Sequence, residues 1–424
     1  MLCEIAPDAH EEFVVFENGK KILCANVLKP LHGMLRAALL YHKKFAADTR
    51  KLGHKVNPHD PCVANKTINN KQHTLTWHVD DAKSSHVDPD VNDKFGKWCE
   101  RMCGSKELGH VKTTRGKMHD YLGMTLNYSM KGKIQVDVRD CVKGILEDFP
   151  HELKSATSPW TGNLFKVDVN SKSSNKEKSE IFHAFVMKCM FLCKRGRPDI
   201  EPGVCFLSTR TEKSTEQDWS KLVRLLTFLK QTKGDMLTLE ADDTKNLHWY
   251  IDAAFAVHPD MRSHTGSNFT MGKGSIVSAS TKQKRNARSS TESELNGTDE
   301  RMSKIAWAKK FLENQGYPVK LNVILQDNAS AIKLLKNGKE SSGKRTRHFD
   351  IRLFYITDLI AASEVSVEYC PTEKMLADYV SKPLVGKKMK IFRAGILNLN
   401  NEHHSQIGQQ ECVGDAVKAV TFNG

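Results

Sequence analysis

Four carboxylates in the C-terminal half of the chain are candidates for one metal-dependent site: Asp252, Glu294, Asp327 and Asp378. Asp252 stands inside an alternating apolar run, where Asp is disfavoured because its side chain competes for backbone hydrogen bonds. Asp327 follows a second such run, and sites in open α/β sheets gather beyond the carboxyl ends of strands. Two carboxylates about 4 Å apart repel by about 4 kcal/mol at an effective dielectric constant of about 20. Such a cluster would need cations. All-oxygen ligands favour Mg²⁺, and two such ions catalyse phosphodiester hydrolysis.

Each of these carboxylates also has an ordinary structural explanation. Glu294 could complete a capping box with Thr291, because T-x-x-E is the signature of that motif. Asp327 could cap the helix that follows it, and Asp378 could be a solvated position on a helix. Asp252 has the weakest alternative of the four, so it is the strongest single candidate.

The elements that must bring these residues together are predicted between residues 245 and 385. Alternating polarity predicts strands at 247–251 and 319–325, with two short strands meeting at turns near Gly266 and 272–274. Apolar spacing and capping residues predict helices at 290–314, 328–337, 349–361 and 372–380, with a strand at 365–369. The order β-β-β-α-β-α-α-β-α predicts an α/β fold, a mixed sheet with helices on its faces.

The rest of the chain divides by composition and pattern. Residues 1–150 alternate short strands and helices, including a hairpin with strands at 74–79 and 82–87 and further strands at 121–126 and 132–138. Residues 151–180 are rich in Ser and Lys, which predicts a linker. Residues 181–240 are predicted to be helical and 241–385 form the α/β segment. Residues 386–424 are expected to be a basic patch followed by a loose tail.

Composition limits the class of protein. The 424 residues suggest about two to four domains. A net charge of +14 favours a polyanionic partner, most simply nucleic acid.

No apolar stretch approaches the roughly 20 residues of a membrane-spanning helix, and the first residues lack the pattern of a signal peptide. The 11 cysteines are too sparse for a disulfide scaffold and lack the spacing of a zinc site. We therefore expect a cytoplasmic or nuclear protein without a membrane partner.

Six short motifs follow one another along the chain. Five lie in its C-terminal half: Tyr250-Ile251-Asp252-Ala253, Ser289 to Glu294, Asp327 to Ile332, Arg347 to Arg352, and Pro371 to Asp378 followed by Lys382-Pro383. The sixth, Arg197 to Ile200, precedes a predicted helix at 217–233. Together they resemble the C-terminal part of the polyprotein of copia-type LTR retrotransposons, most strongly its ribonuclease H region. The resemblance runs from about residue 22 to residue 385.

The resemblance implies a set of catalytic, metal-binding residues for a ribonuclease H, namely Asp252, Glu294, Asp327 and Asp378. It also implies two Mg²⁺ ions and, as substrate, the RNA strand of an RNA–DNA hybrid, which the 2′-hydroxyl distinguishes from DNA. Glu294 is preferred over Glu292 because Leu295 follows it, where the family has an apolar or aromatic residue. Basic residues near the site in sequence are the candidates for binding nucleic acid: Lys282, Lys284, Arg285, Arg347, His348 and Arg352.

The N-terminal half resembles the rear part of a reverse transcriptase palm. His78-Val79-Asp80-Asp81 is similar to the family's Tyr-Val-Asp-Asp hairpin, which implies catalytic roles for Asp80 and Asp81, although two Asp residues also suit an ordinary tight turn. His78 replaces the family's Tyr, and residues 31–38 lack its Lys, Gln and Pro. The family's third catalytic aspartate lies upstream of this chain's first residue. Because polymerisation needs carboxylates around two ions, we expect no DNA synthesis.

Two other interpretations stay open. The chain could be a catalytically silent, nucleic-acid-binding relic of a retroelement. The four carboxylates argue against silence in the C-terminal region, and the altered palm argues for it in the N-terminal region. The other interpretation, a metal-independent hydrolase, is less favoured because the sequence has no G-x-S-x-G motif.

Overall fold

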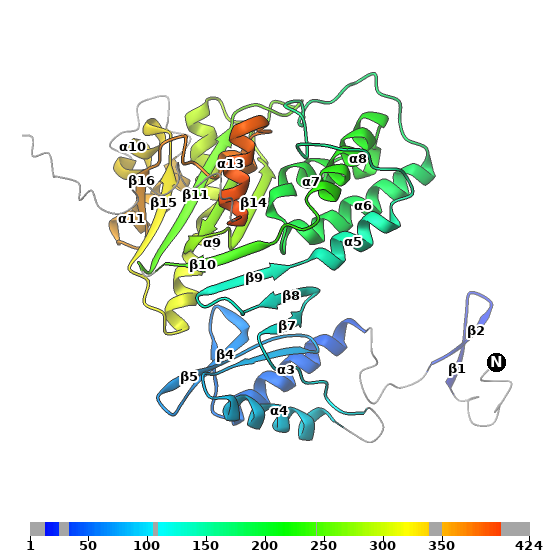
Figure 1. Cartoon of the computed structure of the whole chain (residues 1–424), viewed down its shortest axis with the longest axis vertical. Coiled ribbons are helices and arrows are strands. Elements are labelled where there is room, and N and C mark those ends of the chain that lie inside the picture. Colours follow the sequence, from blue (N-terminus) through cyan, green and yellow to red (C-terminus); the bar gives the residue numbers. More distant parts are fainter. Residues whose placement is uncertain (1–12, 25–33, 105–108, 243, 339–349, 400–424) are drawn as a thin grey trace, which may run out of the picture. The chain divides into compact units, whose positions relative to one another are not determined.

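The computed structural model describes residues 13–24, 34–104, 109–242, 244–338 and 350–399. The chain divides into two compact units, Met1–Val111 and Lys112–Gly424 (Figure 1). Mixed and antiparallel sheets flanked by helices confirm the predicted α/β class. The division differs from the boundary predicted at residue 150, because the strands that follow Val111 pair with later strands of the chain. No helix in the described ranges combines the length and apolar character that crossing a membrane requires.

The first unit is built on a four-stranded antiparallel sheet in the order β3-β4-β5-β6. Its elements are the paired strands β1 (Val14–Glu17) and β2 (Lys20–Leu23), then α3 (Leu35–Lys51), β3 (Lys55–Asn57), β4 (Asp60–Ile68), β5 (Lys71–His78), β6 (Asp81–Ser85) and α4 (Pro89–Cys103). Apolar residues of both helices and of β5, among them Phe45, Trp77 and Phe95, form its core. Strands β5 and β6 form the predicted hairpin, with His78 opposite Asp81.

The second unit begins with a sheet in the order β13-β10-β9-β8-β7. Its strands are β7 (Met118–Tyr121), β8 (Met124–Asn127), β9 (Lys133–Asp137), β10 (Leu237–Ala241) and β13 (Gly272–Lys273). The single strand predicted at 121–126 is wrong, because the chain reverses at Leu122 and Gly123, whose φ angles are 52° and 74°. A Cβ atom at residue 123 would also lie 2.8 Å from the ring of Phe191, so glycine is required twice over.

A helical segment lies between β9 and β10. It comprises α5 (Arg139–Asp148), α6 (Lys176–Cys193), η2 (Pro198–Ile200), α7 (Glu201–Ser208), η3 (Thr211–Lys213) and α8 (Glu216–Gln231). Residues 151–180, predicted as a linker, instead form a packed loop up to the start of α6. Trp160, Leu164 and Phe165 of this loop are buried in one core with α6 and α8. Burial of these few large apolar side chains therefore holds the loop against the helices, although its composition is mostly polar.

The second sheet of this unit has the order β14-β12-β11-β15-β16. Its strands are β11 (Asn246–Ala254), β12 (His264–Thr270), β14 (Val277–Lys282), β15 (Leu321–Gln326) and β16 (Ser366–Tyr369). Strands β11, β12 and β14 are antiparallel, and β15 and β16 run parallel to β11. The accompanying helices are α9 (Ser290–Asn314), α10 (Ala329–Asn337), α11 (Asp350–Ala361) and α12 (Asp378–Ser381). This order is the predicted one, but α12 begins later than predicted because residues after Pro371 form turns.

The two faces of this sheet have different partners. Leu247, Trp249 and Ile251 of β11 pack in one core with residues of α9, α10 and α11. Tyr250, which alternates with them, packs with Met375 beside α12 on the other face. The period of two along a strand therefore directs Asp252 towards α12.

The basic segment that begins at residue 386, expected to be a patch, forms a further helix, α13 (Gly386–Leu397). The expected loose tail from residue 400 onward lies outside the described residues. Met389, Phe392 and Ile396 are buried in the core of the helical segment. Their spacing places them on one helix face, so α13 is an amphipathic helix with its lysines outside.

Candidate metal site

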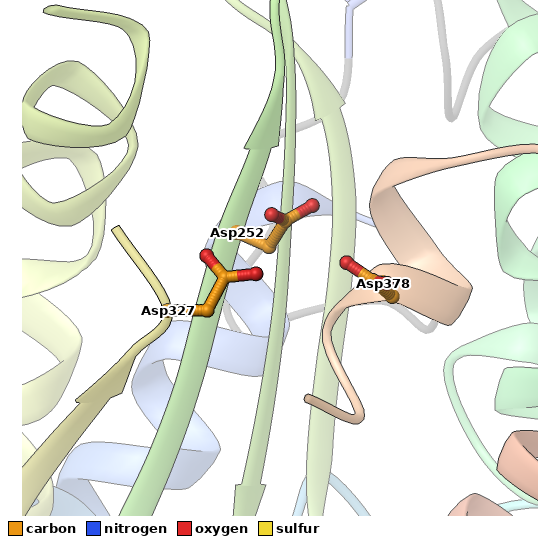
Figure 2. Close-up of side chains that lie close together, drawn as sticks. All are labelled: Asp252, Asp327 and Asp378. Atoms are coloured by element: carbon orange, nitrogen blue, oxygen red, sulfur yellow. The ribbon is translucent and has the colours of Figure 1, made fainter. Parts of the chain in front are cut away.

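Three aspartates that are distant in sequence meet beside the second sheet of the Lys112–Gly424 unit. One carboxylate oxygen each of Asp252, Asp327 and Asp378 lies within 4.8 Å of the other two. Figure 2 shows them facing a common space from a strand, from the end of a strand and from the start of a short helix. Asp252 and Asp378 are 1% exposed and Asp327 is half-buried. Within the described ranges, no other group of three His, Cys, Asp or Glu residues is close enough to share a metal ion.

The close approach of α12 to the sheet depends on a glycine. Gly266 of β12 lies opposite Asp252 of β11. A Cβ atom at residue 266 would lie 2.6 Å from the backbone nitrogen of Ser381 and 2.7 Å from the carbonyl oxygen of Ala377. Both are backbone atoms, which cannot move aside cheaply. Any larger residue would therefore push α12, and Asp378 with it, away from Asp252.

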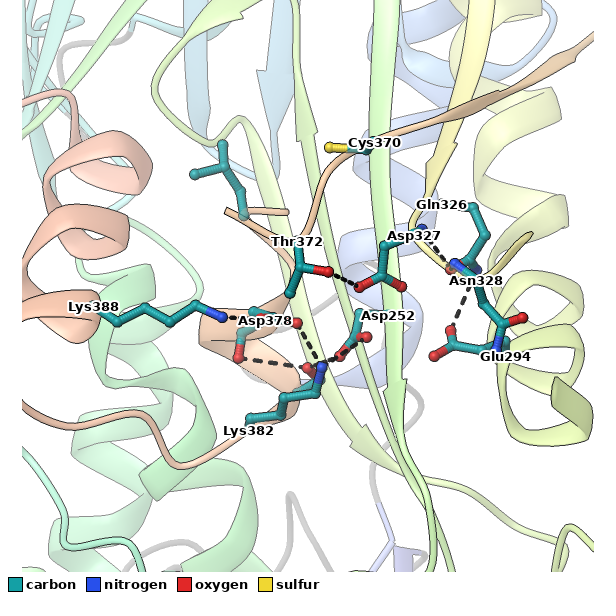
Figure 3. Close-up of polar contacts among 12 residues, drawn as sticks. Asp252, Glu294, Gln326, Asp327, Asn328, Cys370, Thr372, Asp378, Lys382 and Lys388 are labelled. Carbon is teal, nitrogen blue, oxygen red and sulfur yellow. Dashed lines mark hydrogen bonds and ion pairs between the residues drawn. The ribbon is translucent and has the colours of Figure 1, made fainter. Parts of the chain in front are cut away.

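Two lysines compensate the charge of the buried pair (Figure 3). The Lys382 ammonium lies 3.1 Å from Asp252 Oδ1 and 2.6 Å from Asp378 Oδ1. Lys388, which extends from α13, lies 2.6 Å from the other oxygen of Asp378. The Ser381 hydroxyl donates a hydrogen bond to Asp252. Each oxygen of the two buried carboxylates thus has a positive or hydrogen-bonding partner, as burial of charge requires.

Glu294 of α9 approaches the same cluster and is linked to Asp327 through Gln326. The Gln326 side-chain nitrogen donates to Glu294 Oε2 at 3.2 Å. Its side-chain oxygen accepts the backbone N–H of Asp327 at 2.9 Å. The Thr372 hydroxyl donates to Asp327 Oδ2 at 3.1 Å. These bonds fix both the carboxylate of Glu294 and the chain at Asp327 (Figure 3).

The ordinary explanations for the individual carboxylates do not hold. Helix α10 is capped by the side chain of Asn328 and not by Asp327. Helix α9 is capped by Ser289, and Glu292 accepts a hydrogen bond from the backbone N–H of Arg288. Glu294 therefore takes no part in capping this helix. Asp378 is almost fully buried rather than solvated.

The electrostatics of the cluster favour bound cations. Burial, together with the charge of Asp378, raises the pKa of Asp252 despite the nearby Lys382. Burial and the charges of Asp252 and Asp327 raise the pKa of Glu294 well above its usual range. Burial lowers the pKa of Lys382, but the charges of Asp252 and Asp378 outweigh burial, so that its pKa is raised. The neighbouring carboxylates thus add to burial in raising the pKa values of Asp252 and Glu294, and a divalent cation would relieve this repulsion.

The donor set suits a hard metal ion. All four candidate ligands are carboxylates, and three of their oxygens are close enough to share one ion. The ammonium of Lys382 already lies between Asp252 and Asp378, so positive charge is accommodated at that point. The residues present therefore fit a divalent metal ion.

The remaining predicted site residues lie elsewhere or outside the described residues. Asp80 and Asp81 are exposed at the turn between β5 and β6. Lys282 of β14 forms an ion pair with Asp260 at 2.6 Å.

Lys284 and Arg285 are exposed in the loop before α9. Arg347 and His348 lie outside the described residues, and Arg352 lies on α11 without a described side chain.

Sequence reasoning missed the partners of the site's carboxylates, among them Lys382 and Gln326. Lys382 had been quoted only as part of a motif, although its i,i+4 spacing from Asp378 was a local signal of an ion pair. Gln326 gave no signal at all, because its role depends on the approach of α9 to the end of β15.

Comparison with known proteins gives the family context. No family model matches the chain. It is 27% identical over 88% of its length to the retrovirus-related Pol polyprotein from transposon TNT 1-94 of Nicotiana tabacum, and it covers 28% of that protein. It is 31% identical over 44% of its length to the Pol polyprotein from transposon RE2 of Arabidopsis thaliana, covering 13% of it. Against the transposon Ty1-NL2 Gag-Pol polyprotein of Saccharomyces cerevisiae the identity is 21% over 76% of the chain and 19% of the relative.

These homologues confirm the resemblance predicted from the sequence. They are Pol polyproteins of copia-type retrotransposons, and together they cover most of the chain. The chain spans less than a third of the length of each of these three relatives.

Proposed function

We propose that the Lys112–Gly424 unit of this retroelement-related chain hydrolyses the RNA strand of RNA–DNA hybrids. Two Mg²⁺ ions would be held by Asp252, Glu294, Asp327 and Asp378. The observation that carries the proposal is the meeting of three aspartate oxygens within 4.8 Å of one another. Three carboxylates from separate elements, two of them buried, are costly to bring together unless they bind a cation.

The arrangement of the residues supports a site for two ions rather than one. The charge of Asp378 contributes to the raised pKa of Asp252, and the charge of Asp252 contributes to the raised pKa of Glu294. Asp252 is therefore the natural shared ligand. When bound, the ions would activate a water molecule and stabilise the leaving oxygen of the phosphodiester.

The chain's own residues prepare this site. Gln326 and Thr372 orient Glu294 and Asp327. Lys382 holds Asp252 and Asp378 side by side while no divalent ion is present. The exposed Lys284 and Arg285 lie in the loop that leads into α9, where they are proposed to contact phosphates of the substrate.

The test is a cleavage assay on a hybrid with a labelled RNA strand, comparing the full chain with its Asp327→Asn variant. We expect cleavage that requires Mg²⁺, and a loss on the order of 10³-fold in the variant, because one ligand of an oxygen-coordinated ion is weakened. Asn keeps the shape of Asp, so the thermal midpoint should change little. Equal cleavage by both proteins would mean that a contaminating nuclease is responsible and would contradict the proposal.

One observation favours a second candidate, a nucleic-acid-binding protein without catalysis. Lys382 alone already supplies positive charge between Asp252 and Asp378. Under this alternative neither protein cleaves the hybrid, both bind it, and titration calorimetry finds no Mg²⁺ binding that depends on Asp327.

The N-terminal region is proposed to derive from a reverse transcriptase palm, with Asp80 and Asp81 as its carboxylates. We propose that it does not synthesise DNA. In support, both residues are exposed, and the described residues contain no third carboxylate close enough to share an ion with them. Primer extension on an RNA template that is abolished by Asp80→Asn would overturn this proposal.

A further inference from the structure

A cavity of about 600 Å³ lies beside the first turn of α13. It is formed by three segments that are distant in sequence: the loop at 157–162, helix α8 and the chain from Val385 to Lys390. Its polar side chains are hydroxyls and cations, namely Thr157, Ser158, Thr161, Arg224, Lys387 and Lys390. None of its lining residues is acidic. The cavity is therefore built of hydrogen-bond donors and positive charge.

Arg224 of α8 contributes a fixed cation to the cavity lining. Its guanidinium donates to the Ser158 hydroxyl at 3.0 Å, and that hydroxyl donates to the Trp160 carbonyl at 2.7 Å. Its Nε is buried and has no hydrogen-bond partner among the described residues. The lining therefore includes a guanidinium whose position is fixed by Ser158.

Two lysines of the cavity lining, Lys387 and Lys390, lie at the N-terminal end of α13, where positive charge is disfavoured. Helix α13 has no side-chain cap and no acidic residue in its first turn. Its first N–H groups and the positive end of its dipole repel cations. Lys388 is compensated by Asp378. Lys387 and Lys390 are exposed, and neither forms an ion pair with a described residue.

The cavity is joined directly to the carboxylate cluster. Lys388, between the two cavity lysines in sequence, contacts Asp378 at 2.6 Å. The Trp160 ring N–H donates to the Leu384 carbonyl at 2.9 Å, which ties the 157–162 loop to the chain entering α13. The Trp160 and Tyr379 rings lie 5.6 Å apart, so the loop also contacts α12. A ligand in the cavity would therefore be held in a constant relation to Asp378.

We propose that this cavity binds a backbone phosphate of the hybrid, on a nucleotide away from the one being cleaved. The inference rests on the proposed function and deepens it by naming a second contact point for the same substrate. Three cations and the hydroxyls of Thr157 and Thr161 suit a phosphate, which accepts several hydrogen bonds at once. Free phosphate has the same chemistry, but anchorage next to the carboxylate cluster points to the phosphate of a polynucleotide.

The first experiment measures binding without cleavage. Fluorescence anisotropy of a labelled hybrid, in EDTA, compares the full chain with Lys387→Gln/Lys390→Gln. The matched control is Lys131→Gln/Lys154→Gln, which removes two exposed lysines outside the cavity. We expect the cavity variant to bind on the order of tenfold more weakly at low salt, and its salt slope to fall in magnitude by about 1 to 2. The control should retain both values. Equal behaviour of the two variants would overturn the proposal.

The second experiment locates the phosphate. A single methylphosphonate, which removes one backbone charge, is moved along either strand. We expect one or two positions at which it weakens binding of the wild-type chain but not of the cavity variant. A uniform effect at every position would mean a general charge effect and would contradict a defined site. Inorganic phosphate is the third arm: if it saturates the cavity lysines while no methylphosphonate position matters, the ligand is free phosphate and the proposal fails.

These outcomes are separable from those of the cleavage assay. Binding is measured in EDTA, so a chain that never cleaves can still show a position-specific phosphate contact. Conversely, a chain that cleaves normally but shows no difference between the cavity variant and its control retains the proposed function and loses this inference.

Discussion

The two groups of aspartates that the sequence offered have opposite surroundings. Asp80 and Asp81 are adjacent in sequence and exposed on a hairpin of the first unit. Asp252 and Asp378 are distant in sequence, 1% exposed and joined through Lys382. Adjacent carboxylates in a turn require no special environment. Carboxylates that come from separate elements and are buried side by side do require a special environment. Their burial and their closeness in space are therefore stronger evidence for a site than a short sequence motif.

The largest expected difference between the two groups is in nuclease activity. Asp252→Asn should reduce hybrid cleavage on the order of 10³-fold, because it removes the charge of the carboxylate shared by both sides of the cluster. Asp81→Asn, in the other unit, should leave the rate within about twofold. Initial rates of both variants at saturating Mg²⁺ measure this, with circular dichroism as the control for folding. Comparable losses of cleavage rate in both variants would mean that the two groups of aspartates do not differ in their importance for cleavage.

The next difference concerns stability in the absence of metal. Removing one member of a fully buried ion pair costs about 3–5 kcal/mol. Since the Lys382 side chain is 35% exposed, Lys382→Met should cost about 2 kcal/mol in EDTA. Added Mg²⁺ should recover much of this loss, because the ion replaces the missing charge. Urea unfolding with and without Mg²⁺ measures both effects.

The matched control for Lys382 is an exposed ion pair of the first unit. Lys44 pairs with Asp48 at 3.2 Å, and the Lys44 side chain is 66% exposed. Lys44→Met should cost less than about 0.5 kcal/mol, and Mg²⁺ should not alter its effect. A Lys382→Met variant that behaves like this control would show that the charge of Asp252 and Asp378 is compensated from elsewhere.

The elements of the candidate site could be predicted from local patterns. Alternation around Asp252 gave both the strand β11 and the face on which the carboxylate lies. Caps and apolar spacing gave α9 with its observed ends. These patterns are readable because each depends on residues a few positions apart.

Features that depend on contacts between distant residues could not be predicted in this way. The ion pair between Lys388 and Asp378 exists only because α13 packs near α12. The loop at 151–180 is ordered by Trp160 and Phe165, whose burial in the helical core outweighs a polar composition. The reversal at Leu122 interrupts a run of residues that otherwise suits a strand, and only a positive φ at two successive residues reveals it.

The two units should respond alike to acid. Each contains a buried chain of two histidines and a serine: His54, His73 and Ser84 in the first, His258, His264 and Ser280 in the second. Burial lowers the pKa of His73 and of His258 to about 4. The unfolded chain, with a histidine pKa near 6.5, then binds more protons than the folded one. Stability is therefore lost as the pH falls from about 6.5 towards 4.

The expected loss between about pH 7 and pH 5 is about 1–2 kcal/mol for each of these histidines. Urea midpoints of the wild type, His73→Gln and His258→Gln at the two pH values measure it. Each variant should be less sensitive to acid than the wild type, whatever its stability at pH 7. An unchanged pH dependence in either variant would show that the histidine in question titrates normally in the folded chain.

The smallest expected effect tests whether the hairpin that carries Asp80 and Asp81 is more than a turn. Val79 precedes them with a φ of 48°, a conformation that is strained for a β-branched residue, and its side chain is 44% exposed. The first position of such a two-residue turn favours glycine. Val79→Gly should therefore stabilise the first unit by about 1 kcal/mol, since it relieves strain and removes no buried contact. The urea midpoint measures this. A destabilised variant would mean that a contact of the valine side chain stabilises the unit by more than the backbone strain destabilises it. The hairpin would then have a role beyond reversing the chain.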